Sequence, residues 1–234
     1  MCTVSFVNSN GKIIITSNRD ELVARPALQP EMYAMGHKKV YFPKDPKAGG
    51  TWFAVDENAN AIVLLNGASE KHESNPPYRK SRGLIVLDLI GADSPLLQWE
   101  TIDLSGIEPF TLVLYGQNHL NQLRWNGSEK ESVSLNPLEH YIWSSSTLYP
   151  KNVRDTRAQW FEKFMVKPDV NEAELFDFHR YTEDENHENG LVINRNGFLK
   201  TLSITQTVIE NNKMNLLHHD LLNQKETEHS FLIL

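Results

Sequence analysis

The 234-residue sequence contains a single cysteine, Cys2, which directly follows the initiator methionine. One cysteine excludes an intramolecular disulfide and a zinc site built from several cysteines. The thiol of Cys2 is therefore either a small apolar core group or a reactive group. Its neighbours in the fold decide between these two roles.

Long apolar segments are also absent. No run approaches the roughly 20 apolar residues that span a bilayer. The N-terminal residues lack the basic segment and continuous apolar segment of a secretory signal. We therefore expect a cytoplasmic protein without a membrane span.

Basic charge is scarce, with 23 Lys and Arg residues against 30 Asp and Glu residues and a net charge of -7. No basic block suggests a nucleic-acid partner. The adjacent His218 and His219 would point to opposite faces of a strand, and no other metal-ligand spacing accompanies them. We expect neither a metal nor a cofactor.

The N-terminal residues predict a β-hairpin. Two short β-branched runs flank a turn-rich segment; the runs are residues 3–7 and 13–17, and the turn is residues 8–11. With a four-residue loop, Val7 pairs with Lys12.

This register places Cys2 opposite Ser17. Arg19 then shares the face of Ser17, whereas Asn18 and Asp20 point to the other side. Local geometry alone therefore brings the Ser-Asn-Arg-Asp-Glu segment beside the cysteine.

The rest of the chain alternates strands and helices. Strands are expected at residues 53–55, 61–65, 110–115, 122–125, 131–135, 141–144, 190–194, 198–209, 214–220 and 228–233. Helices are expected at residues 81–90, 94–101, 151–166 and 172–181, the second with Ser94 as N-cap. The four strands between residues 110 and 144 read as one antiparallel meander, and residues 26–46 as an irregular region.

Hairpin-length connections favour an α+β fold, with antiparallel sheets covered by helices, over a parallel doubly wound sheet. No repeat, low-complexity segment or linker interrupts the chain. We expect one domain over residues 1–234, and the sequence leaves its oligomeric state open.

Removal of Met1 would make Cys2 the N-terminal residue, with a thiol and a free α-amine. A thiol with a pKa near 8.5 is only a few per cent thiolate at neutral pH. An α-amine titrates near 7.7 to 8.0 and could serve as the general base for its own side chain. Nucleophile and base would then come from one residue.

Such a nucleophile needs partners. Oxyanion donors could come from Asn66, Asn18 and the serines at 144–146. Arg19 could lower the pKa of the thiol, and Asp20 could orient the amine.

Several motifs follow one another in a specific order: Met-Cys at the N-terminus, Asn-Arg-Asp-Glu at 18–21 with Arg-Pro at 25–26, Ala-Gly-Gly-Thr-Trp at 48–52, Leu-Asn at 65–66, Ser-Arg-Gly at 81–83 and the segment 145–157. In this order they resemble the NRDE family, also called the transport and Golgi organisation protein 2 family. The resemblance continues more faintly to the end of the chain, where residues 201–208 are similar to the family's final core segment.

The NRDE family is similar to N-terminal nucleophile hydrolases. The resemblance therefore implies a four-layer αββα sandwich of two antiparallel sheets. It also implies that Cys2 is the nucleophile, that Asp20 binds its amine and that Asn66 serves the oxyanion. We add Arg19 to this catalytic set, and we assign substrate contacts to Asn18, Ser145, Ser146 and Arg157.

Two positions depart from the pattern of the related hydrolases. Their arginine usually stands three residues before the aspartate, where this chain has Ser17, and Arg19 comes two places later on the same face. Their mid-chain asparagine is replaced here by serines. Ser146 could still donate a hydrogen bond, but its side chain is shorter than that of asparagine. These differences bear on amidase activity more than on the fold.

The leading hypothesis is an N-terminal cysteine hydrolase that cleaves a non-peptide C–N amide bond, or a related acyl bond, of a small molecule. The alternative is a non-catalytic carrier of haem, a lipid or acyl-CoA on the same fold. Structural roles compete with each assignment: a surface ion-pair network around Arg19 and Asp20, a turn role for Asn66 and a solvated helix position for Arg157. The glycines at 49 and 50 read as structural, with Trp52 in the core.

Overall fold

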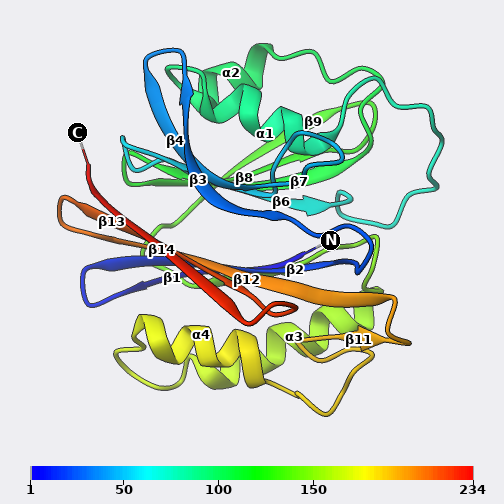
Figure 1. Cartoon of the computed structure of the whole chain (residues 1–234), viewed down its shortest axis with the longest axis vertical. Helices are drawn as coiled ribbons and strands as arrows, with labels where there is room; N and C mark the ends of the chain where they lie inside the picture. The colour runs from blue at the N-terminus through cyan, green and yellow to red at the C-terminus, as the bar shows by residue number, and fades with distance from the viewer. Residues whose placement is uncertain (1, 234) are drawn as a thin grey trace. The chain divides into compact units, whose positions relative to one another are not determined.

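The computed structural model describes residues 2–233, which divide into two compact units. The first unit comprises residues 2–26 and 138–232, and the second comprises residues 27–137 with Ile233. Each unit contains one seven-stranded antiparallel sheet and two helices (Figure 1). The predicted α+β class with two antiparallel sheets is confirmed, and the single domain over residues 1–234 stays a prediction.

The sheet of the first unit holds β1 and β2 as neighbouring inner strands, in the order β10-β1-β2-β12-β13-β14, with β11 paired to β12. Its strands are β1 (Cys2–Ser9), β2 (Lys12–Leu22), β10 (Tyr141–Ser144), β11 (Asn194–Arg195), β12 (Leu199–Glu210), β13 (Lys213–Asp220) and β14 (Lys225–Leu232). The N-terminal strands are thus fixed by pairing on both sides.

The N-terminal hairpin is confirmed, but its predicted register is wrong by two residues. Ser9 pairs with Lys12, so Cys2 lies opposite Arg19 and not opposite Ser17. The reason is the turn: Asn10 and Gly11 have φ values of 52° and 76°. Two consecutive residues with positive φ form the tight hairpin turn that matches the twist of the strands. A shift of two residues keeps every side chain on its predicted face.

Helices α3 (Lys151–Phe164) and α4 (Glu172–Tyr181) cover one face of this sheet (Figure 1). α4 begins with a capping box, in which the side chains of Asn171 and Glu174 each accept the other's backbone N–H. The apolar cluster beneath the helices consists of Val7, Ile14, Phe161, Val170, Leu175, Phe178, Leu191 and Val208. Odd-numbered residues of β1 therefore face the helices, and Cys2 lies on the opposite face.

The sheet of the second unit runs in sequence order from β3 to β9. Its strands are β3 (Leu28–Met35), β4 (Lys38–Lys44), β5 (Phe53–Asp56), β6 (Ala61–Asn66), β7 (Phe110–Gly116), β8 (His119–Trp125) and β9 (Lys130–Leu135). Helices α1 (Arg82–Ile90) and α2 (Pro95–Thr101) belong to this unit, and α1 contacts β5 and β6.

Capping and close approach in the second unit agree with the sequence. The Ser94 side chain accepts a hydrogen bond from the Leu97 N–H, which confirms it as the N-cap of α2. A Cβ on Gly50 would lie 2.3 Å from the carbonyl carbon of Gly83 at the start of α1. Only glycine permits this contact, and Trp52 is buried, so the structural interpretation of this motif is confirmed.

Three expectations about secondary structure are wrong. Residues 26–46 are not irregular, because they contain the β3–β4 hairpin. Residues 141–144 do not continue the meander, because β10 pairs with β1 in the other sheet. The strand at 190–194 is reduced to β11, because residues 182–193 are held by loop contacts such as the Gly190 N–H to the Asn186 carbonyl.

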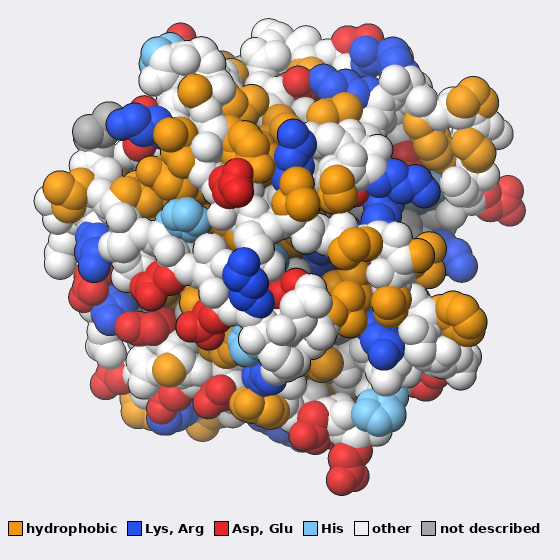
Figure 2. All heavy atoms as spheres, viewed as in Figure 1, with side chains coloured by type: hydrophobic (Ala, Val, Ile, Leu, Met, Phe, Trp, Pro, Cys, Tyr) orange, Lys and Arg blue, Asp and Glu red, His pale blue; other side chains and the backbone are white. Residues whose placement is uncertain are grey.

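Within residues 2–233, no helix is both long enough and apolar enough to cross a membrane. The same residues contain no group of three or more His, Cys, Asp or Glu side chains placed to hold a metal ion. On the face seen in Figure 2, acidic and basic side chains are interspersed.

Candidate active site

Cys2 begins β1 and is 1% exposed. The Ser145 N–H donates a hydrogen bond to the Cys2 carbonyl at 3.0 Å, just beyond the end of β10. The backbone of Cys2 is therefore held by both neighbouring strands, which gives its side chain a defined position.

A row of polar residues crosses the sheet from Cys2. Cys2 lies opposite Arg19, Arg19 opposite Ser203 and Ser203 opposite Asp220, so all four share one face. This row and the next one carry hydroxyl and imidazole groups that are also inside the protein: Ser17, Ser203, Thr205 and His218 are all buried. We call this surface the Cys2 face.

The bulge between Thr201 and Ser203 shapes this row. The register of β12 against β2 shifts there, so Thr201 pairs with Asp20 while Ser203 pairs with Arg19. The bulge thus sends Thr201 to the helix side and Ser203 to the Cys2 face. The Ser203 and Ser17 hydroxyls have no oxygen or nitrogen partner within the described residues.

Burial raises the pKa of the Cys2 thiol, and the nearby Asp20 carboxylate raises it further. The Arg19 guanidinium and the Ser17 hydroxyl act in the opposite direction. Desolvation is the largest effect, so the resting group is the neutral thiol. A reaction at this sulfur requires a base that removes its proton during attack.

Arg19 is the side chain directly across from Cys2, and it is 3% exposed. Its Nη1 donates to the Arg25 carbonyl at 3.0 Å. The structure brings these two predicted residues together more closely than the predicted register did.

Asp20 lies on the other face, beneath the helices. Its carboxylate accepts hydrogen bonds from the Tyr149 hydroxyl at 2.6 Å and from the Thr201 hydroxyl at 2.7 Å. Burial raises the pKa of Asp20, and the positive charge of Arg157 partly offsets this rise. Burial and the Asp20 charge raise the pKa of Tyr149 well above its usual value, so Tyr149 is a fixed donor.

Arg157 is completely buried and not on a solvated helix surface. Its guanidinium lies 3.6 Å from the centre of the Tyr149 ring and donates to the Thr3 hydroxyl at 2.5 Å. It also donates to the carbonyls of Asn189 and Gly190. Through these contacts Arg157 holds Tyr149, which donates to Asp20, in place. Its predicted contact with a substrate stays a prediction.

Asn18 also faces the helices. Its Nδ2 donates to the backbone carbonyls of His179 and Leu191 at 3.0 and 2.7 Å. Its Oδ1 therefore faces His179 Nδ1, which must carry the proton, and His179 Nε2 accepts from the Ser5 hydroxyl at 2.7 Å. Asn18 thus joins β2 to α4 through a neutral histidine.

The remaining predicted residues lie in different places. Ser145 and Ser146 are buried after β10, and the Ser145 hydroxyl lies 2.9 Å from that of Thr147. Asn66 is the last residue of β6 in the second unit, where it pairs with Phe110. The following Gly67 has a φ of 84°, which ends the strand. The oxyanion role of Asn66 stays a prediction.

Sequence reasoning missed Tyr149 and His179, and it considered His218 only as a metal ligand. Tyr149 and His179 lie far from Cys2 in sequence and carry no motif of their own. Thr201 lies in residues 201–208, which resemble the family's final core segment. That resemblance was the available signal that this strand contributes to the site around Asp20.

We predict that Tyr149→Phe lowers the free energy of unfolding by about 2 kcal/mol, because it removes a donor from a buried carboxylate. Tyr141→Phe is the matched control, since the Tyr141 hydroxyl bonds the exposed Glu139 at 3.0 Å. We expect this control to lose less than about 0.5 kcal/mol. Urea denaturation followed by tryptophan fluorescence measures both, and equal losses would contradict the assigned role of Tyr149.

The fold is shared with solved structures of an acid amidase and a bile acid hydrolase. An N-acylethanolamine-hydrolyzing acid amidase ortholog from Caenorhabditis elegans is 12% identical, with a TM-score of 0.64 over 88% of this chain and 92% of that one. A mutant conjugated bile acid hydrolase from Clostridium perfringens is 8% identical, with a TM-score of 0.55 over 99% and 92%. A second variant of that hydrolase is also 8% identical, with a TM-score of 0.55 over 97% of this chain and 92% of that one. At identities this low, the structural similarity shows a common fold alone.

The sequence has no significant match among curated proteins. Residues 1–217 match the family described as Transport and Golgi organisation 2, and this match includes strands of both sheets as well as all four helices. The order of motifs in the sequence and the fold agree with this match. The chain belongs to the Transport and Golgi organisation 2 family.

Proposed function

We propose that this protein is an N-terminal cysteine hydrolase that cleaves the amide C–N bond, or a related acyl bond, of a small molecule. The observation that carries the proposal is the position of Cys2, which begins an inner strand directly opposite Arg19. The similar structures support the reaction class, because those proteins are named as an acid amidase and a bile acid hydrolase.

In the first step, the Cys2 sulfur attacks the substrate carbonyl carbon while the thiol proton passes to the α-amine, which Met1 removal has exposed. The ammonium then gives this proton to the leaving nitrogen as the C–N bond breaks. A thioester on Cys2 and a free amine result.

In the second step, water attacks the thioester carbon and the amine accepts a proton from the water. The C–S bond breaks, the sulfur regains its proton and the carboxylic acid leaves. The overall reaction consumes one water and yields one acid and one amine.

The neutral state of the buried thiol supports this route. A thiol whose pKa is raised by burial does not hold a resident thiolate, so the proton must leave during attack. The α-amine of the same residue is a base that needs no further side chain. Asp20 would orient that amine, with Tyr149 and Thr201 fixing the carboxylate.

The oxyanion of the intermediate requires donors. Within the first unit we assign this role to Ser146, and the oxyanion role of Asn66 stays a prediction. Arg19 would stabilise the negative charge that develops near the sulfur. Asn18, Ser145 and Arg157 support the site through the contacts of β1 and β2 described above.

The test is turnover of N-acyl amides, measured as amine released. Cys2→Ala and Cys2→Ser are expected to lose at least about 1,000-fold in rate, because the nucleophile is removed or replaced by a poorer one. Ser9→Ala at the other end of β1 is the matched control and should keep full activity. Turnover that persists in Cys2→Ala would refute the proposal.

The burial of the thiol also favours a second candidate function, a non-catalytic carrier of haem, a lipid or acyl-CoA. A carrier does not use the sulfur as a nucleophile. It therefore predicts that no amide is cleaved and that Cys2→Ala binds the same ligand with unchanged affinity. Binding of haem and of a fatty acyl-CoA to both proteins separates the two functions.

A further inference from the structure

A cavity of about 380 Å³ lies in the first unit at the C-terminal end of α4. It is open to solvent and lined by the end of α4, the following loop, the start of β12 and the turn between β13 and β14. Cys2, Arg19 and Asp20 do not line it. The proposed hydrolysis therefore gives this cavity no role.

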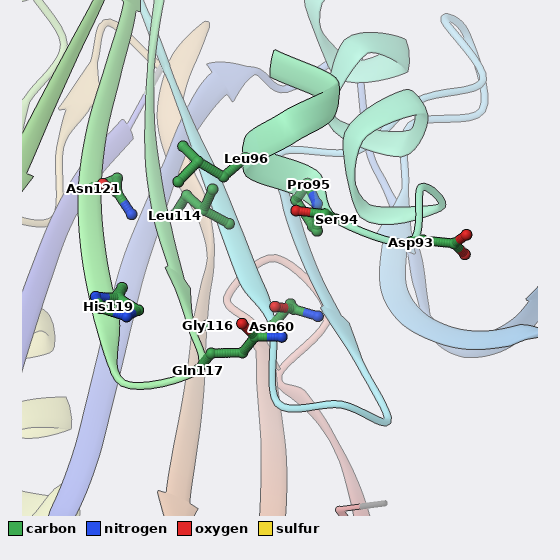
Figure 3. Close-up of a pocket in the computed structure, with 10 residues that line it drawn as sticks. All are labelled: Asn60, Asp93, Ser94, Pro95, Leu96, Leu114, Gly116, Gln117, His119 and Asn121. Carbon is green, nitrogen blue, oxygen red and sulfur yellow. The ribbon is translucent and has the colours of Figure 1, made fainter. Parts of the chain in front are cut away.

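Its size sets it apart from a smaller cavity in the second unit. Figure 3 shows the smaller one between the start of α2, with Pro95 and Leu96, and the β7–β8 hairpin, with Gly116 and His119. That cavity measures about 100 Å³. Sites for organic ligands in proteins usually measure about 300–1,000 Å³, so the cavity beside α4 reaches this range and the smaller one does not.

The polar lining of the larger cavity carries an excess of positive charge. The Lys200 ammonium has no hydrogen-bonding or charged partner among residues 2–233. The Arg180 guanidinium bonds the Tyr181 hydroxyl at 3.0 Å and reaches His219 Nδ1 at 3.5 Å, so neither contact neutralises it. Of the acidic residues at 183–188, only Asp184 lines the cavity.

The lining also has an apolar part, beside the polar residues His187, Asn194, Thr201 and Gln224. Val192 and Leu222 contribute aliphatic side chains, and Tyr181 is 55% exposed. An exposed aromatic ring next to two cations suits a ligand with an apolar, flat body and an anionic end.

We propose that this cavity binds a small organic anion, a carboxylate or phosphate carried on an apolar aromatic body, with Lys200 and Arg180 at the anionic end. The apolar body lies against Tyr181, Val192 and Leu222. Cys2, Arg19 and Asp20 do not line the cavity, although Thr201, which donates to Asp20, does. The binding therefore uses none of the reacting groups of the proposed hydrolysis.

The probes share one body and differ in charge: phenylpropionate, phenylethyl phosphate, phenylethylammonium and phenylethanol. Isothermal titration calorimetry on the full chain measures their affinities. We expect at least one anion to bind at least about tenfold more tightly than the alcohol and the ammonium compound. The better of the two anions identifies the head group. Equal affinity for the alcohol and both anions, or no binding of either anion, would overturn the proposal.

Variants test the charges directly. Lys200→Gln should weaken binding of the preferred anion at least about tenfold, and Asp184→Asn should strengthen it. Lys213→Gln, an exposed lysine outside the cavity, is the matched control and should leave the affinity unchanged. Equal effects of Lys200→Gln and Lys213→Gln would contradict the proposed site. The affinity of Cys2→Ala should equal that of the wild type, so failure of the hydrolase proposal remains distinguishable from failure of this one.

Discussion

Replacing Lys38 with methionine is expected to lower the free energy of unfolding of the second unit by about 3–5 kcal/mol. Lys38 is 2% exposed, and its Nζ lies 3.2 Å from Asp56 Oδ2. The same ammonium donates to the carbonyls of Ile90 and Ala92, at 3.3 and 2.5 Å, where α1 ends. The substitution leaves a buried carboxylate without its counter-charge and two carbonyls without a donor.

The Asp56 carboxylate has further hydrogen-bond partners, so the effects of replacing Lys38 and Asp56 should be coupled. It accepts from the N–H groups of Asn58 and Asn60 and from the Asn60 side chain, so it ties the β5–β6 turn to β4 and α1. Asp56→Asn removes the charge and keeps the shape. The double variant Lys38→Met with Asp56→Asn should therefore lose less stability than the sum of the two single variants.

Lys39→Met is the matched control, because this neighbouring side chain is 61% exposed and lies 3.9 Å from Glu57. It should change the free energy of unfolding by less than about 0.5 kcal/mol. Urea denaturation of the wild type and the four variants measures these values. A loss for Lys38→Met as small as that for Lys39→Met would show that the buried pair does not hold the unit together.

Acid is expected to destabilise the first unit between pH 6.5 and pH 4.5, because His179 is buried as a neutral side chain. Desolvation and, to a smaller extent, the positive charge of Arg157 together lower its pKa from a usual value of 6.5 to about 3. The unfolded chain therefore binds a proton below pH 6.5 that the folded chain does not bind until about pH 3. Stability is complete above pH 6.5 and falls as the pH falls, by roughly 2–3 kcal/mol at pH 4.5.

His218 on the Cys2 face acts in the same direction. Desolvation lowers its pKa to about 4, and its Nδ1 lies 2.8 Å from the Thr205 hydroxyl. Its effect covers the range from pH 6.5 down to about 4. The two histidines together make the loss of stability in weak acid steep.

The variant His179→Gln isolates one of these effects. The slope of the free energy of unfolding against pH between 4.5 and 6.5 should fall by about 1.4 kcal/mol per pH unit relative to wild type. His119→Gln, at an exposed position of β8, should leave the slope unchanged. An unchanged slope in His179→Gln would mean that His179 is not held neutral in the folded protein.

The hairpin, the four helices and the face of each N-terminal residue could be predicted because they depend on local patterns. Alternation fixed which side chains share the face of Cys2, and a two-residue error in register did not change it. The turn residues Asn10 and Gly11 decided the register, and both the four-residue and the two-residue loop fit the same apolar pattern. The β3–β4 hairpin was missed because Pro30 and Pro43, which lie within these strands, argue against regular structure in a sequence.

The surroundings of Asp20 could not be predicted, because they depend on contacts across more than a hundred residues. Tyr149 and Thr201 reach Asp20 from a loop and a late strand. Arg157 lies on a helix whose polar residues suggested solvent, yet the loop at Asn189 and Gly190 encloses its guanidinium. Only the tertiary structure distinguishes such a buried arginine from a surface one.

Intact mass spectrometry shows whether Cys2 is an activated N-terminal nucleophile. Native-start protein is measured before and after brief exposure to p-nitrophenyl acetate, with Cys2→Ala and urea-unfolded protein as controls. We expect loss of Met1 and one acetyl group on folded wild-type protein, removable by hydroxylamine because it is a thioester on the Cys2 sulfur. Retained Met1, or acetylation equal to that of Cys2→Ala, would show that Cys2 is not an activated N-terminal nucleophile.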